Sequence, residues 1–100
     1  MTLDKLDLLK VRAESFRRVL TQASESAKKN HVTKSTAEEF NRLLDEVATG
    51  FPEVADALPK KILASSRGPS LIGCVDVKLV ELEILSEQLV GIIDLLISKR

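Results

Sequence analysis

The residues from 70 to 98 are apolar on two sides of an expected α-helix. At about 100° per residue, one broad face collects eight apolar side chains: Val75, Leu79, Leu82, Leu85, Leu89, Ile92, Ile93 and Leu96. The opposite side collects a second set of apolar and small residues: Gly73, Val77, Val80, Ile84, Gly91 and Leu95. A small monomeric bundle needs one buried face on each helix, so the second face predicts a second packing partner.

We interpret that partner as another copy of the chain and predict an oligomer interface at Val77, Val80, Ile84, Gly91 and Leu95. The alternative is that one short chain covers this helix on both sides. We do not expect this helix to span a membrane, because six charged residues lie between Asp76 and Asp94, both included. Each such charge costs about 2.5–3.5 kcal/mol near the bilayer centre.

The first third of the chain has the most regular apolar spacing. Positions three and four residues apart are apolar throughout: Leu6, Leu9, Ala13, Phe16, Leu20, Ala23 and Ala27. This spacing predicts one long helix over residues 3–29. Thr2 is the expected N-cap, Asp4 lies in the expected first turn, and Asn30 is the expected stop.

A second, shorter helix is predicted over residues 36–49. Ser35-Thr36-Ala37-Glu38 has the pattern of a capping box. At the other end, Gly50 is expected to adopt the left-handed conformation of a Schellman motif. Phe51 would fold back over the last turn, and Pro52 would prevent the helix from continuing.

The remaining connections give the expected architecture. Pro52 suits the first position of a short helix over 52–58, and a further helical turn over 59–65 is left open. Gly68-Pro69 breaks the chain before Ser70, the expected cap of the 70–98 helix. No strand-like alternation is identified. The prediction is an all-α single domain over residues 1–100, a bundle whose two long helices run roughly parallel.

Composition narrows the class of protein. Fifteen basic and fifteen acidic residues give zero net charge, and the only aromatic residues are three phenylalanines. The first 34 residues carry eight basic and four acidic residues, or +4, whereas residues 35–58 carry one basic and six acidic, or −5. Cys74 is the only cysteine, so an intrachain disulfide is excluded. With no signal peptide visible, a cytoplasmic location is expected.

Few residues are candidates for catalysis or for ligand binding. Lys60, Lys61 and Arg67 precede Gly68 and are weak candidates for anion binding, because the glycines of a phosphate-binding loop are missing. His31 stands without a second histidine, and a metal site needs three or four ligands. No metal, cofactor or small-molecule ligand is therefore expected, and no catalytic residue is predicted.

Charged side chains indicate how two helices could be ordered. Between the apolar faces of the last helix lies an acidic strip of Asp76, Glu83, Glu87 and Asp94. The first helix carries Lys10, Arg17 and Lys28 along one edge of its apolar face. The hypothesis is that the two strips flank a shared seam and fix the helix order, each exposed pair adding at most about 1 kcal/mol.

The resulting functional expectation is a protein that acts through protein–protein contacts, as a self-associating structural, adaptor or regulatory subunit. Its partner would be itself, as a dimer or larger, or another helical protein. The alternative from another class is a nucleic-acid-associated regulator that uses the basic first helix and the basic loop at 60–67. A nucleic-acid partner is disfavoured because the basic residues are spread around the helix and mixed with acidic ones.

Overall fold

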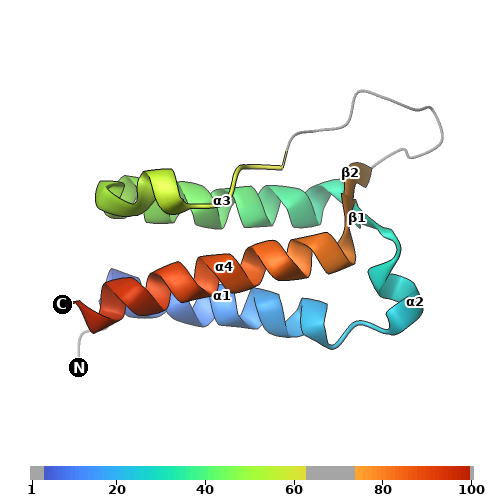
Figure 1. Cartoon of the computed structure of the whole chain (residues 1–100), viewed down its shortest axis with the longest axis horizontal. Coiled ribbons are helices and arrows are strands. Elements are labelled where there is room, and N and C mark those ends of the chain that lie inside the picture. The colour runs from blue at the N-terminus through green and yellow to red at the C-terminus, as the bar shows by residue number, and fades with distance from the viewer. Residues whose placement is uncertain (1–3, 63–73, 100) are drawn as a thin grey trace.

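A computed structural model describes residues 4–62 and 74–99 of the 100-residue chain. The fold is an all-α bundle, as predicted, with a small two-stranded sheet at one end (Figure 1). Its elements follow in chain order: α1 (Lys5–Thr21), α2 (Glu25–Lys28), β1 (His31–Thr33), α3 (Lys34–Gly50), the 3₁₀ helix η1 (Pro52–Ala57), β2 (Cys74–Lys78) and α4 (Leu79–Ser98).

The predicted first helix is divided into α1 and α2. Asp4 is the N-cap of α1, and its Oδ1 accepts a hydrogen bond from the Leu6 N–H at 3.2 Å. The helix ends at Thr21, and Ser24 caps α2 by accepting from the Ala27 N–H at 3.2 Å. The prediction of one helix over 3–29 is wrong because a serine side chain that can bond to the backbone favours a new helix start over a helix interior. The predicted cap Thr2 lies outside the described residues.

The third helix starts and ends differently from the prediction. Thr33 is the N-cap, accepting from the Thr36 N–H at 3.3 Å, so α3 begins two residues earlier than expected. At its C-terminus Gly50 is helical and has no left-handed φ, so the Schellman ending is wrong. Phe51 instead leaves the helix with φ −138° because proline disfavours helical conformation in the preceding residue. Phe51 is partly buried and packs against the core.

The two strands are an unpredicted feature. His31 pairs with Lys78 and Thr33 pairs with Cys74 in an antiparallel arrangement, with an irregularity between them. The predicted helix over 70–98 therefore begins only at Leu79, and residues 74–78 are extended. Val32 of β1 is buried in the core. The Asn30 carbonyl accepts from the Leu79 N–H at 3.0 Å, which ties the first turn of α4 to the sheet.

The strand pair also sets the direction of α4. Because β2 lies beside β1, α4 starts at the end of the bundle where α3 starts (Figure 1). Consequently α4 is parallel to α3 and antiparallel to α1, with both termini at the same end (Figure 1). The prediction that the two long helices run parallel is wrong. It assumed a helical return after residue 52, whereas the described residues after η1, 58–62, are extended or irregular.

The side chain of Asn41 fixes this return segment to α3. Its Nδ2 donates to the Ile62 carbonyl and its Oδ1 accepts from the Ile62 N–H, both at 2.8 Å. One amide thus pairs with both backbone groups of a buried residue, as a neighbouring strand would. The short helix predicted over 52–58 is present as η1. The turn left open over 59–65 is not helical as far as residue 62, and residues 63–65 lie outside the described ranges.

The core is aliphatic and is shared by α1, α3 and α4. Its buried apolar side chains are Leu6, Leu9, Ala13, Leu20, Val32, Ala37, Phe40, Leu43, Leu44, Val47, Ile62, Leu82, Leu89, Val90, Ile93 and Leu96. The helical spacing of the sequence predicts that six residues are buried together: Phe16, Leu20, Phe40, Leu44, Leu82 and Leu89. Five of these six are in the core. The sixth, Phe16, is partly buried and stacks on Phe40 with ring centroids 5.9 Å apart.

Truncation of a core leucine should destabilise the protein strongly. We expect Leu20→Ala or Leu89→Ala to lower the free energy of unfolding by about 2–5 kcal/mol, since both side chains are buried. Urea unfolding followed by circular dichroism measures this loss. Leu8→Ala is the control, because Leu8 is exposed and its truncation should cost under about 0.5 kcal/mol. Losses below 0.5 kcal/mol at both buried sites would contradict the assignment of the core.

Removal of the Asn41 amide should release the return segment. Asn41→Ala deletes two hydrogen bonds, each worth about 0.5–1.5 kcal/mol, so the free energy of unfolding should fall by about 1–3 kcal/mol. Amide hydrogen exchange should show the largest loss of protection at Ile62. Thr49→Ala, an exposed change on the same helix, should leave the Ile62 exchange rate unchanged. Unaltered protection of Ile62 in Asn41→Ala would contradict this role.

Candidate interaction surface

Three ion pairs join α4 to α1 and α2. Each pairs a basic residue of the first third with an acidic residue of the last helix: Lys10 Nζ with Asp94 Oδ1 at 3.1 Å, Arg17 Nη1 with Glu87 Oε1 at 3.8 Å, and Lys28 Nζ with Glu83 Oε2 at 3.2 Å. The hypothesis that these strips flank a shared seam is confirmed for all three basic residues. The fourth predicted acid, Asp76, belongs to β2. From Lys10 to Lys28 the residue numbers of the acidic partners fall from 94 to 83, as expected for two antiparallel segments.

The pairs differ in their exposure to solvent. The Lys28 and Glu83 side chains are 26% and 19% exposed, whereas Arg17 and Glu87 are 39% and 58% exposed. Solvent screens the more exposed pair, so it contributes little stability on its own. The main effect of the three pairs is therefore to fix the register of α4 along α1 and α2, and they add little to the stability of the fold.

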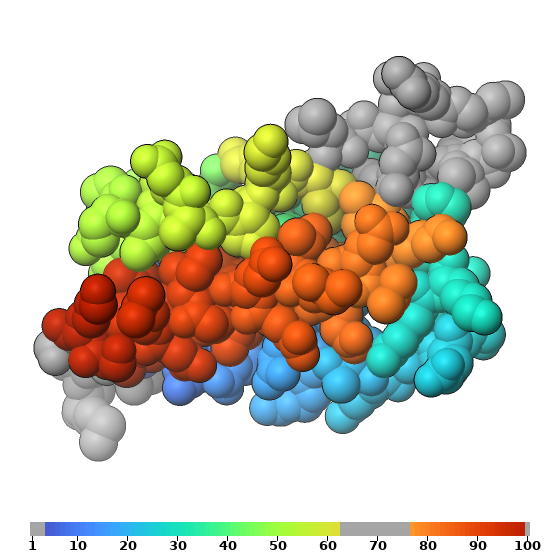
Figure 2. Space-filling model, in the orientation of Figure 1, coloured from blue at the N-terminus to red at the C-terminus, as the bar shows by residue number. Residues whose placement is uncertain are grey.

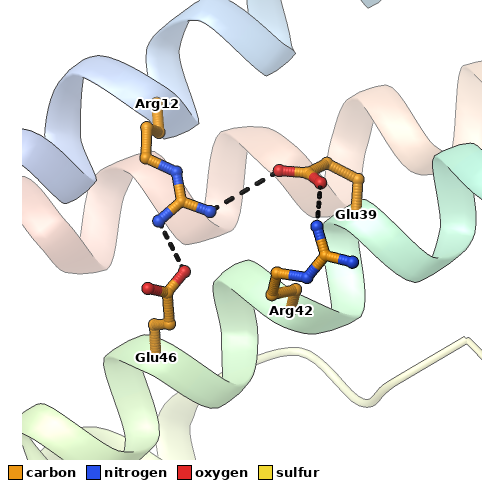
Figure 3. A network of polar contacts seen from close by, with 4 residues as sticks. All are labelled: Arg12, Glu39, Arg42 and Glu46. Atoms are coloured by element: carbon orange, nitrogen blue, oxygen red, sulfur yellow. Dashed lines mark hydrogen bonds and ion pairs between the residues drawn. The ribbon is translucent and has the colours of Figure 1, made fainter.

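A further set of charges joins α1 to α3 (Figure 3). Arg12 Nη1 lies 2.5 Å from Glu46 Oε2, and Arg12 Nη2 lies 3.5 Å from Glu39 Oε1. The other carboxylate oxygen of Glu39, Oε2, lies 2.8 Å from Arg42 Nη1. The network therefore contains two guanidinium groups and two carboxylates. The Arg12 guanidinium is thus paired with carboxylates of its own chain, which compensate its charge.

The outer side of α4 departs from an ordinary polar surface, because apolar side chains are exposed along it. Val80, Ile84 and Leu95 are 40%, 54% and 48% exposed, and Gly91 lies on the same side of the helix. We call these four residues the outer face. Figure 2 shows α4, in orange and red, uncovered along its length between α3 in green and α1 in blue. In this isolated chain the second apolar side of the helix is therefore not buried.

The fifth residue of the predicted interface has a different position. Val77 belongs to β2 and is partly buried against the core. It could not share a helical face with Val80, because the chain is extended up to Lys78. The structure brings together the other four predicted residues, and none of them contributes to the buried core.

Two further apolar features lie outside the outer face. Beside Leu95, a hollow of about 420 Å³ is lined in part by Phe51, Val54 and Leu96. On α1, three exposed residues were missed as a group by the sequence analysis: Leu8, Val11 and Val19. They border the Arg12 network, and polar Ser15 separates Val11 from Val19 along their stripe.

Two of the three anion-binding candidates, Lys60 and Lys61, lie within the described residues. Lys61 pairs with Asp45 of α3, and Lys60 is exposed on the return segment. Arg67 lies outside the described residues. His31 occupies the first position of β1, and Cys74 begins β2.

Residues 4–62 and 74–99 also bear on metal binding and on membrane insertion. No group of three or more His, Cys, Asp or Glu side chains in these ranges is placed to hold a metal ion. None of the helices there combines the length and the apolarity needed to cross a membrane.

The Lys10–Asp94 pair makes a specific prediction about titration. The hydrogen bond to Asp94, together with the attraction of its charge, raises the pKa of Lys10 above 10.5. A raised pKa means that the folded state binds this proton more tightly than the unfolded state. The pair's contribution to stability is therefore present below the ordinary lysine pKa and is lost as the pH rises through the folded value.

We expect Asp94→Asn to lower the pKa of Lys10 towards its ordinary value, as measured by NMR titration of the Lys10 side chain. Glu87→Gln removes the acid that faces Arg17 and should leave the Lys10 titration unchanged. An equal pKa in the wild-type and Asp94→Asn proteins would contradict the pairing.

Comparison of the chain with protein-family models, with curated proteins and with solved structures finds no match. The charged seam and the exposed apolar faces are therefore the basis on which a function can be proposed.

Proposed function

We propose that this protein acts through protein–protein contacts, as a self-associating structural, adaptor or regulatory subunit, and that the outer face of α4 is its contact surface. The observation that carries the proposal is the exposure of Val80, Ile84 and Leu95 along one side of a helix. Burial of apolar surface is favourable by about 25 cal/mol per Å². Large apolar side chains that are exposed along one side of a helix favour an interaction site there.

The position of Gly91 supports the same surface. Glycine in a helix interior is less favourable than alanine by roughly 0.5–1 kcal/mol. A Cβ atom added at Gly91 would meet nothing within 4 Å beyond the adjacent backbone of its own helix, so nothing in the described part of the chain requires a glycine there. A partner that approaches the backbone of α4 closely supplies a reason for this residue.

The charge distribution supports protein contacts over the nucleic-acid alternative. Four of the eight basic residues in the first third lie against carboxylates of this chain: Lys10, Arg12, Arg17 and Lys28. A duplex binder needs a surface whose potential stays positive. Internal pairing reduces that potential along α1, and Lys61 of the basic loop also faces an acid.

Light scattering at micromolar concentration tests the proposal. We expect a mass of at least twice the 11.0 kDa of one chain. Ile84→Glu places a charge within the outer face and should return the mass to that of a monomer, with an unchanged helical circular dichroism spectrum. Ile84 is exposed in the single chain, so the variant should fold.

The control is Val19→Glu, which places the same charge on the exposed apolar residues of α1 and should leave the assembly intact. A wild-type mass of 11.0 kDa that persists at high concentration would contradict self-association. Assembly that survives Ile84→Glu and is lost in Val19→Glu would place the contact on α1 and overturn the assignment of the surface.

A further inference from the structure

We propose that two copies of this chain pair through their α4 helices in antiparallel orientation, with a two-fold axis that passes between Glu87 and Gln88. The inference rests on the proposed self-association and adds its geometry. In a two-fold interface the same patch is used by both copies, and each contact occurs twice. The patch must therefore be complementary to itself, and the outer face can be tested for this property.

The spacing of the outer face has that self-complementarity. Ile84 and Gly91 lie equally far from the midpoint between Glu87 and Gln88, on opposite sides of it. Val80 and Leu95 are also equally far from the same midpoint. Antiparallel pairing about this midpoint therefore places Ile84 of each copy over Gly91 of the other, and Val80 of each copy over Leu95 of the other.

The shape of the surface favours this register over a parallel one. Ile84 is the most exposed apolar residue of α4, at 54%, and Gly91 presents open space where a side chain would otherwise lie. Antiparallel pairing thus puts the most prominent side chain into the gap. Parallel pairing in register would put Ile84 against Ile84 and Gly91 against Gly91, which leaves a void at one level and crowds the other.

The polar residues beside the axis are compatible with the same arrangement. A residue next to a two-fold axis meets its own copy, and the Gln88 amide suits this position because it both donates and accepts hydrogen bonds. Two Glu87 carboxylates would also approach one another on the other flank. Each of them faces the Arg17 guanidinium of its own chain, with Nη1 and Oε1 3.8 Å apart, so the flank of each copy is already neutralised.

The end of the bundle offers room for the partner. The hollow of about 420 Å³ next to Leu95 includes the apolar side chains of Phe51 and Val54. In the antiparallel register the partner's first turn of α4 lies over Leu95, at the rim of this hollow. The contact surface would then extend from the helix pair onto the C-terminal end of α3 and onto η1 without any change of fold.

Cysteine cross-linking tests the register. In a Cys74→Ser background, the double variant Ile84→Cys/Gly91→Cys should form intermolecular disulfides that join position 84 of one copy to position 91 of the other, identified by peptide mass mapping. Packed helix axes about 8–10 Å apart bring facing Cα atoms into the 4.4–6.8 Å range of a disulfide. Each single cysteine variant should cross-link poorly, because like positions lie about 10 Å apart along the axis.

Efficient 84–84 or 91–91 disulfides would show a parallel or shifted pairing and overturn this inference while leaving self-association intact. A dimeric mass with no 84–91 disulfide would do the same. A monomeric mass for the unsubstituted protein would instead contradict the proposed function on which the inference rests.

Exchange of the two residues provides a second test. Gly91→Ile sets isoleucine against isoleucine and Ile84→Gly leaves a gap, so each should weaken dimerisation by about tenfold or more. The double variant Ile84→Gly/Gly91→Ile restores one isoleucine opposite one glycine and should return the dissociation constant to within about threefold of the wild type. Additive weakening in the double variant would contradict the contact between positions 84 and 91.

Discussion

The antiparallel packing of α1 against α4 is the contact on which the rest of the structure depends. Both helices are buried along their inner faces, and each contributes a small residue to the buried surface, Ala13 from α1 and Ser86 from α4. Small side chains let two helices approach closely. The Ser86 hydroxyl donates to the Glu83 carbonyl of its own helix at 2.8 Å, so its burial requires no polar partner on α1.

This packing determines which side of α4 is left for a partner. The inner face of α4 is buried in the core, and its acidic strip pairs with Lys10, Arg17 and Lys28. The outer face is the side of α4 that remains free to contact a partner. The sheet makes the arrangement consistent, because β2 starts α4 at the end of the bundle where its charges align with those of α1 and α2. The same constraints that order the helices therefore expose Val80, Ile84 and Leu95.

The features that were predictable from the sequence are those with a helical period over a long segment. The spacing of Leu82 and Leu89 predicted a buried face. The positions of Lys10 and Arg17 on the first helix and of Glu87 and Asp94 on the last predicted that the two charged strips flank one seam, whereas the individual pairs come from the structure. The direction of α4 was not predictable in this way. The spacing of the charged strips on the two helices allows either direction, and the pairing of β1 with β2 decides between them. Val75-Asp76-Val77-Lys78 alternates apolar and polar residues, a strand signal that is short and was masked by the helical pattern that follows it. At Ser24 a local cap prevailed over a continuing apolar period.

The orientation of α4 relative to α1 is the central claim, and pulsed electron spin resonance measures it directly. In a Cys74→Ser background, spin labels at Val11 and Ser98 should be closer together than labels at Val11 and Lys78. Lys78 and Ser98 lie about 30 Å apart along α4, and the antiparallel order should separate the two distances by about 10 Å. Dilution with unlabelled protein restricts the signal to pairs within one chain. A shorter distance from Val11 to Lys78 than from Val11 to Ser98 would contradict the account.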